Sequence, residues 1–232
     1  MRNDIVILLR VLISAVFFAI LLKVDVRLEF WGIAYMGLGM LIKYGDIVFD
    51  DLRDVGEEEK LRVHLLGLTS AMAMGTLMIV DYFSFIVFTG MIGGLLATRK
   101  IDSRDFKVAT VFLSAFFVFS MVSHTVLYAR NPPLTLLWVG IIAFCSALDE
   151  VGNGRAEGRG GVIARILYYR PFMKLGVVVM SIIAFRPAYA LVFLLFDMGY
   201  ELMAELFNHY VYLSRFSQSR SPQRAPCLDQ GP

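Results

Sequence analysis

The chain is poor in charge and in cysteine. Of its 232 residues only 18% are charged, against about 25% in an ordinary soluble domain. The two cysteines are Cys145, inside an apolar run, and Cys227, in a polar stretch, a placement that predicts neither a disulfide nor a zinc site. The net charge of +2 offers no broad basic surface for nucleic acid. These shortages, with a hydrophobic content of 58%, exclude a nucleic-acid-binding module, a disulfide-stapled secreted fold and a disordered chain.

The chain contains several long apolar runs. A helix that crosses a bilayer needs about 20 apolar residues, with a range of about 17–25. Segments of this kind occupy 5–23, 30–48, 62–80, 82–98, 107–129 and 133–149. The sequence therefore predicts an all-α fold, a polytopic transmembrane bundle of seven or eight helices in a single domain over 1–212.

The stretch 172–212 is too long for one crossing and is interrupted at Arg186-Pro187. Proline lacks a backbone donor and disfavours helix in the residue before it. We predict two spans, 172–185 and 187–208, while one long kinked helix remains the alternative. The segment 213–232 is rich in Ser, Arg, Pro and Gln, which predicts a disordered basic tail.

The basic residues indicate an orientation, because Lys and Arg concentrate on the cytoplasmic side of membrane proteins. With the N-terminus inside, 18 of the 22 Lys and Arg face the cytoplasm, all except Lys23, Arg27, Arg130 and Arg186. We therefore expect an integral protein of the plasma membrane with a cytoplasmic N-terminus.

The acidic residues follow the basic ones, which positive-inside sorting does not require. All of the 20 Asp and Glu lie on the predicted inner side except Asp25, Glu29 and Asp81. Solvated loops explain such a cluster, and so does a polar cavity that opens to the cytoplasm.

Three carboxylates are spaced by four residues near the end of the second predicted span. Asp46, Asp50 and Asp54 lie along one face of a helix at this spacing. An ionised carboxylate within the hydrocarbon costs about 2.5–3.5 kcal/mol, so Asp46 is a functional candidate. The residues 50–54 also spell DDxxD, whose hard oxygens suit Mg²⁺. A solvated helix end is the simpler explanation for Asp50 and Asp54.

Two further groups follow predicted spans on the same side. Asp149 and Asn153 are four residues apart, and glycines from Gly152 onward predict a helix break and a loop in which Arg155 could contact a phosphate. Arg99 and Lys100 follow the span 82–98. They are candidates for phosphate contact, or anchors that fix the topology.

Asp197 and Glu201 lie deepest in the last predicted span. Polar residues at this depth normally face the interior of a bundle, so both are candidates to bind substrate. The alternative is that Asp197 is structural and pairs with a basic group such as Arg10 or Lys43.

The acidic spacing on the second and sixth predicted spans resembles that of the UbiA-type intramembrane prenyltransferases. That family carries an NxxxDxxxD motif on its second helix and a DxxxD motif on its sixth. Here Asp46 stands in place of the first Asn and Asn153 in place of the last Asp, the arginine-proline segment after the first motif is missing, and the family has nine helices. The resemblance covers these two short motifs.

The resemblance implies a site and a cofactor. Asp46, Asp50, Asp54 and Asp149 would act as catalytic residues that carry Mg²⁺. The candidates to hold the diphosphate oxygens are Arg10, Lys43, Arg99, Lys100 and Arg155. Asn153, Asp197 and Glu201 are further candidates to bind substrate.

The sequence thus favours a Mg²⁺-dependent intramembrane enzyme that acts on a polyprenyl diphosphate or related lipid at the cytoplasmic leaflet and transfers the prenyl group to a lipid or aromatic acceptor. A cation transporter or channel with an acid-lined pathway is the first alternative, and a non-catalytic membrane scaffold is the second. The expected partner is a membrane lipid, with no nucleic acid, and a homo-oligomer is left open.

Overall fold

The computed structural model describes residues 2–24, 26–51, 57–99, 104–125, 132–156 and 161–219. All regular structure in these ranges is α-helical, which confirms the predicted all-α class. The helices are α1 Arg2–Val24, α2 Val26–Asp51, α3 Glu57–Val80, α4 Tyr82–Ala97, α5 Arg104–Ser123, α7 Pro132–Ala156, α8 Val162–Tyr168, α9 Pro171–Ile183 and α10 Ala188–Ser219.

The predicted division of the stretch 172–212 into two helices is confirmed. Helix α9 ends at Ile183 and α10 begins at Ala188. Phe185 between them adopts a left-handed backbone with φ of 54°, and Pro187 follows. The last carbonyls of α9 accept hydrogen bonds from the N–H groups of Ala184, Phe185 and Arg186, so the chain leaves one helix and starts the next without a long loop.

The predicted helix break at Gly152 is wrong. Helix α7 continues through Gly152 and Gly154 and ends at Ala156. Gly152 is buried, and a Cβ there would lie 3.1 Å from the side chain of Leu167 on α8. The glycine therefore lets α8, a short helix in the connection that we expected to be a loop, pack closely on the end of α7.

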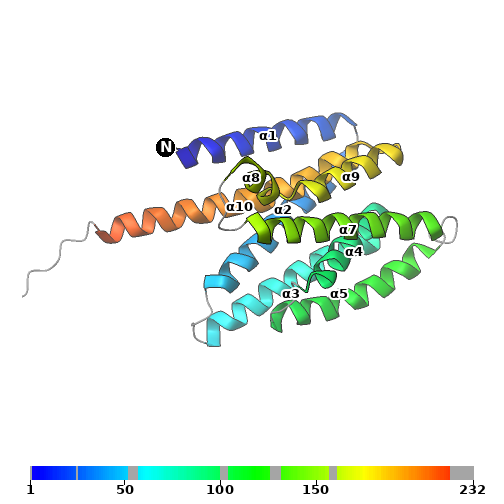
Figure 1. The fold of residues 1–232 in the computed structure, drawn as a ribbon, viewed down its shortest axis with the longest axis horizontal. Coiled ribbons are helices and arrows are strands. Elements are labelled where there is room, and N and C mark those ends of the chain that lie inside the picture. Colours follow the sequence, from blue (N-terminus) through cyan, green and yellow to red (C-terminus); the bar gives the residue numbers. More distant parts are fainter. Residues whose placement is uncertain are drawn as a thin grey trace, which may run out of the picture.

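Successive long helices run in alternating directions, so their ends collect at two opposite poles (Figure 1). One of these poles holds the start of α1, the end of α2, the end of α7 and the start of α9. We call it the charged pole. Helix α2 packs along α10, α4 along α7 and α3 along α5, while α1 contacts both α2 and α10. Helix α9 contacts both α7 and α10, and so links the α4–α7 pair to the α2–α10 pair.

Glycines allow the backbones of α2 and α10 to touch. A Cβ on Gly39 would lie 2.1 Å from the carbonyl oxygen of Phe196, and a Cβ on Gly199 would lie 2.2 Å from that of Met36. No side chain fits at either distance. The two glycines thus set how closely α2 and α10 approach.

The small-residue face on α4 packs against α7. A Cβ on Gly90 would meet the side chain of Ile142 at 2.7 Å, and one on Gly94 would meet that of Ser146 at 2.5 Å. The four-residue spacing of these glycines thus forms a helix-packing face.

An aromatic cluster fills the middle of the molecule. Tyr35 of α2 stacks on Phe88 of α4 with ring centroids 5.1 Å apart, and Phe196 of α10 meets both rings edge-on. Phe193 stacks on Phe196 at 5.8 Å. These side chains are at most 8% exposed, so their rings fill the space where α2, α4 and α10 meet.

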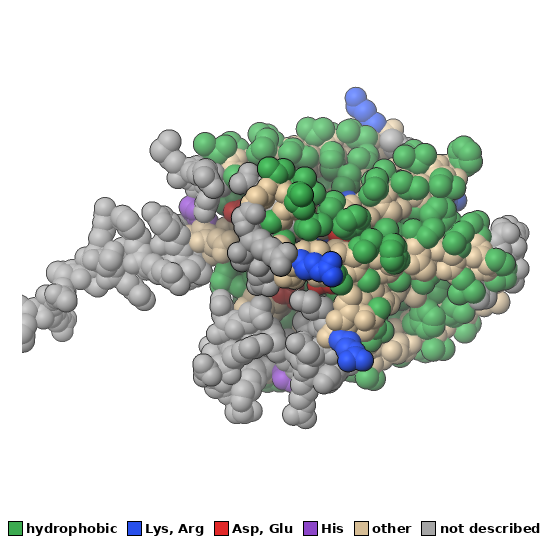
Figure 2. Space-filling model, viewed as in Figure 1, with side chains coloured by type: hydrophobic (Ala, Val, Ile, Leu, Met, Phe, Trp, Pro, Cys, Tyr) green, Lys and Arg blue, Asp and Glu red, His purple; other side chains and the backbone are tan. Residues whose placement is uncertain are grey.

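The outer surface is apolar over most of the face in Figure 2, with a few charged side chains between the apolar areas. Large hydrophobic side chains point outward on every long helix that flanks the core, among them Leu8, Phe30, Val118, Phe144 and Ile182. One described helix, Pro132–Ala156, is long and apolar enough to cross a membrane. Shorter apolar helices cover Ile5–Leu21, His64–Val80, Tyr82–Ala97, Ala109–Ser123 and Pro171–Ile183.

Candidate functional site

Asp149, on the last turns of α7, caps the start of α9. Its Oδ1 accepts the backbone N–H of Phe172 at 2.9 Å, and its Oδ2 accepts that of Met173 at 2.7 Å. The first N–H groups of a helix have no partner within the helix, and its positive dipole end favours a carboxylate. A buried acid that looks like a ligand in the sequence therefore serves to attach α9 to α7.

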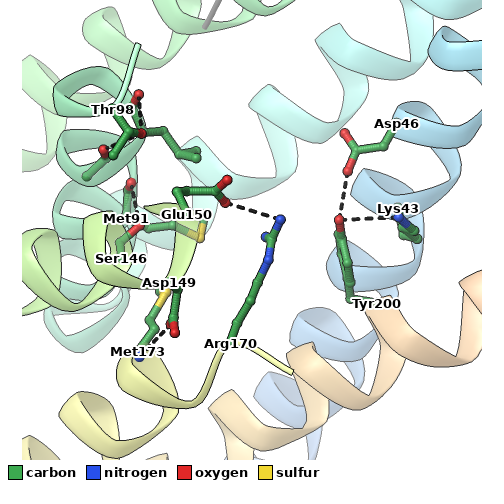
Figure 3. Close-up of polar contacts among 12 residues, drawn as sticks. Lys43, Asp46, Met91, Thr98, Ser146, Asp149, Glu150, Arg170, Met173 and Tyr200 are labelled. Carbon is green, nitrogen blue, oxygen red and sulfur yellow. Dashed lines mark hydrogen bonds and ion pairs between the residues drawn. The ribbon is translucent and has the colours of Figure 1, made fainter. Parts of the chain in front are cut away.

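Arg170 precedes α9 and reaches across the charged pole (Figure 3). Its backbone is left-handed, with φ of 48°, an arrangement that is uncommon outside glycine and often found at functional sites. The guanidinium pairs with Glu150 of α7 at 3.1 Å and lies 5.7 Å from the centre of the Tyr200 ring on α10. Arg170 thus connects α7 with α10.

The charge of Arg170 is retained in spite of its burial. Desolvation lowers the pKa of its guanidinium, but the phenol of Tyr200 and the carboxylates of Glu150, Asp46 and Asp149 raise it, and the net pKa lies above the ordinary value. The side chain is therefore a permanent cation at the charged pole.

Tyr200 joins α10 to α2. Its hydroxyl donates to Oδ2 of Asp46 at 2.9 Å and accepts from Nζ of Lys43 at 3.5 Å. The Lys43 ammonium also lies 4.8 Å from the centre of the Tyr200 ring. Two cations, Lys43 and Arg170, therefore flank one aromatic ring beside a carboxylate, as Figure 3 shows.

Four charges form a ladder between α1, α9 and α10. Lys174 pairs with Asp197 at 2.7 Å and approaches Glu201 at 3.5 Å. Arg10 of α1 pairs with the other oxygen of Glu201. Each of these side chains is less than a quarter exposed, so pairing offsets the cost of keeping the charges out of water.

A cavity of about 150 Å³ opens among these groups. Helices α1, α2, α7 and α10 and the connection between α8 and α9 all contribute to it. Its walls carry three cations, three carboxylates, two phenols, two amides and one alanine: Arg10, Lys43, Arg170, Asp197, Glu201, Glu205, Tyr169, Tyr200, Asn153, Asn208 and Ala204.

The structure brings together five of the residues that the sequence predicts for the site. Arg10, Lys43, Asn153, Asp197 and Glu201 all line the cavity, although they are spread over 191 positions of the chain. Asp46 contacts the wall through Tyr200.

The remaining candidates are not seen in the cavity. Arg99 and Arg155 are exposed and do not belong to its lining. Asp50 lies on α2, but its side chain is outside the described part of the chain, and so are Asp54 and Lys100. Their predicted roles stay predictions.

Sequence reasoning missed Arg170, Lys174 and Tyr200. Lys174 is the ion-pair partner of Asp197, whereas the alternative considered from the sequence named Arg10 or Lys43. A signal existed for Arg170, because a residue before proline at a helix start is held outside the helix. Tyr200 lies between Asp197 and Glu201 on α10 and offered no signal, since a tyrosine in an apolar helix is usually core.

The carboxylates of the site offer few ligands for Mg²⁺. Within the described residues no three His, Cys, Asp or Glu side chains are grouped to hold a metal, and Asp149 commits both oxygens to backbone N–H groups. Mg²⁺ is commonly bound by one or two carboxylates together with substrate phosphates and waters. One oxygen of Asp46 is bound by the Tyr200 hydroxyl, and the side chain of Asp50, one turn further along α2, lies outside the described part of the chain.

Comparison with protein-family models, with curated proteins and with solved structures finds no match to this chain.

Proposed function

We propose that the protein is a polytopic membrane protein whose long helices lie across the bilayer with the charged pole on the cytoplasmic side. Outward-facing Leu, Ile, Val and Phe side chains support this, because water-soluble monomers rarely expose large contiguous apolar areas. Helix α7 has the length and composition of a span. The alternating helices also carry the predicted basic connections to one pole.

Within that setting the proposed activity is Mg²⁺-dependent chemistry on a polyprenyl diphosphate or a related lipid, with prenyl transfer to a lipid or aromatic acceptor. One observation supports it above the others: a cavity lined by three cations and three carboxylates opens at the charged pole. Such a site can hold a phosphorylated head group while the lipid chain stays in contact with the apolar outer surface.

Each residue has a proposed role. Lys43 and Arg170 hold the diphosphate oxygens beside Tyr200, and the Asp46 face of α2 holds the metal. Bound Mg²⁺ would neutralise charge that develops on the leaving diphosphate. Tyr200 positions Lys43 and Asp46 relative to each other through one hydroxyl.

The aromatic cluster weighs against the alternative of a cation pathway. A path through the bilayer needs polar groups along its whole length. Tyr35, Phe88 and Phe196 fill the middle with their rings in contact. Of the two, the enzyme is therefore the function that we propose.

The test is turnover of labelled geranylgeranyl diphosphate by the purified full chain in lipid nanodiscs with mixed lipid acceptors. We expect product only with Mg²⁺ and a loss of at least tenfold in Lys43→Met. Lys23→Met, an exposed lysine near the opposite pole, is the matched control and should keep full activity. Metal-independent turnover, or no turnover at all, would reject the activity.

A further inference from the structure

The charges of the cavity are not all paired. Asp197 is neutralised by Lys174 and Glu201 by Arg10. Glu205, one turn further along α10, also lines the cavity, and the ion pairs found among the described residues do not include it. Asn208 follows three residues later on the same wall. This wall therefore presents a carboxylate and an amide to whatever occupies the cavity.

The opposite wall offers unused donors. Arg10 of α1 makes one hydrogen bond, to Glu201, although a guanidinium carries five N–H donors. Within the described part of the chain its Nε has no hydrogen-bond partner, and this atom is buried. Arg10 and Glu201 also bring α1 next to the part of α10 that continues to Glu205. Arg10 and Glu205 thus line the same cavity.

A ligand of one sign does not satisfy these walls. An anion would place its charge against Glu205, and a simple cation would face Arg10, Lys43 and Arg170. We propose that this part of the cavity binds a zwitterionic head group, with its phosphate at Arg10 and its primary ammonium at Glu205 and Asn208. The cavity volume of about 150 Å³ equals that of engineered cavities that take a benzene-sized molecule, which suits a head group rather than a lipid chain.

This inference deepens the proposed function by naming a class of head group for the same cavity, and it rests on that function only for the assignment of the cavity as a lipid site. Binding of the head group itself can be measured without turnover, so its failure is distinguishable from failure of the prenyl transfer.

The experiment compares soluble probes and lipids on the purified full chain. Calorimetry measures binding of phosphoethanolamine, inorganic phosphate and ethanolamine, and nanodiscs that contain phosphatidylethanolamine or phosphatidylglycerol supply the lipid form. We expect phosphoethanolamine to bind at least fivefold more tightly than either fragment. If phosphatidylethanolamine binds and free phosphoethanolamine does not, the ligand is the head group of a lipid. If both bind, the cavity recognises the phosphate and the ammonium whether or not they belong to a lipid.

Two variants with opposite expected effects on amine binding test the inference. Glu205→Gln keeps the shape of the side chain and should remove the preference for the amine, whereas Asn208→Asp adds a negative charge and should strengthen amine binding several-fold. Glu29→Gln, near the opposite pole, is the matched control. Equal binding of inorganic phosphate and phosphoethanolamine, with no preference for phosphatidylethanolamine, overturns the inference. The same follows if Glu29→Gln has the effect of Glu205→Gln.

Discussion

At the scale of single residues, the charged groups of this chain divide into those that hold helices together and those that face the cavity. Asp149 belongs to the first kind, because both of its oxygens are used by the start of α9. Lys43 belongs to the second, because its contacts are with the hydroxyl and the ring of Tyr200. Burial alone does not separate the two kinds; their hydrogen-bond partners do.

Asp149→Asn tests the capping role. The amide oxygen can keep one of the two backbone bonds, but the second acceptor and the negative charge at the helix start are lost. We expect a loss of about 1–3 kcal/mol in the free energy of unfolding, measured by denaturant titration in detergent. Glu29→Gln removes a carboxylate elsewhere and should change stability little; equal losses in the two variants would refute the role of Asp149 as a cap.

Many of the residues that line the cavity could be predicted from the sequence. Arg10, Lys43, Asp197 and Glu201 interrupt apolar helices, and the cost of charge in such surroundings predicts that they turn inward and meet. Tyr200 and Lys174 could not be identified, because their importance depends on which helix lies opposite. Asp149 shows the reverse case, since the same physics that marks a buried acid as functional also fits a helix cap.

At the scale of helices, the contact of α2 with α10 carries the site, since Lys43 and Asp46 come from one and Tyr200 from the other. Gly39→Ala should push the two helices apart, because its Cβ would lie 2.1 Å from a carbonyl oxygen. We expect a cost of about 1–3 kcal/mol and weaker ligand binding. Gly45→Ala on the same helix meets nothing within 4 Å and should be neutral or stabilising; equal behaviour of the two variants would contradict this packing.

The positions of the helices were largely predictable from apolar runs, and the break before α10 from Pro187. The continuation of α7 through Gly152 was not. Glycine lowers helix propensity by about 1 kcal/mol, but here its small size lets Leu167 of α8 approach. Tertiary packing therefore overrides the local preference, and a single sequence does not reveal where that happens.

At the scale of the whole molecule, the two poles should face opposite sides of the bilayer. In a background with Cys145→Ser and Cys227→Ser, single cysteines at Arg99 and Arg155 should react with an impermeant maleimide from one side of oriented vesicles. A cysteine at Phe185, which is 92% exposed, should react from the other. Labelling of all three from the same side would exclude the proposed topology.

The central claim is that the cavity at the charged pole binds a lipid diphosphate together with Mg²⁺. Equilibrium binding of labelled geranylgeranyl diphosphate to the full chain in nanodiscs, with Mg²⁺ or with a chelator, tests it most directly. The account predicts saturable binding that requires Mg²⁺ and falls at least tenfold in Asp46→Asn and in Lys43→Met, but not in Lys23→Met. Binding that is indifferent to Mg²⁺ and unchanged in the first two variants would contradict it.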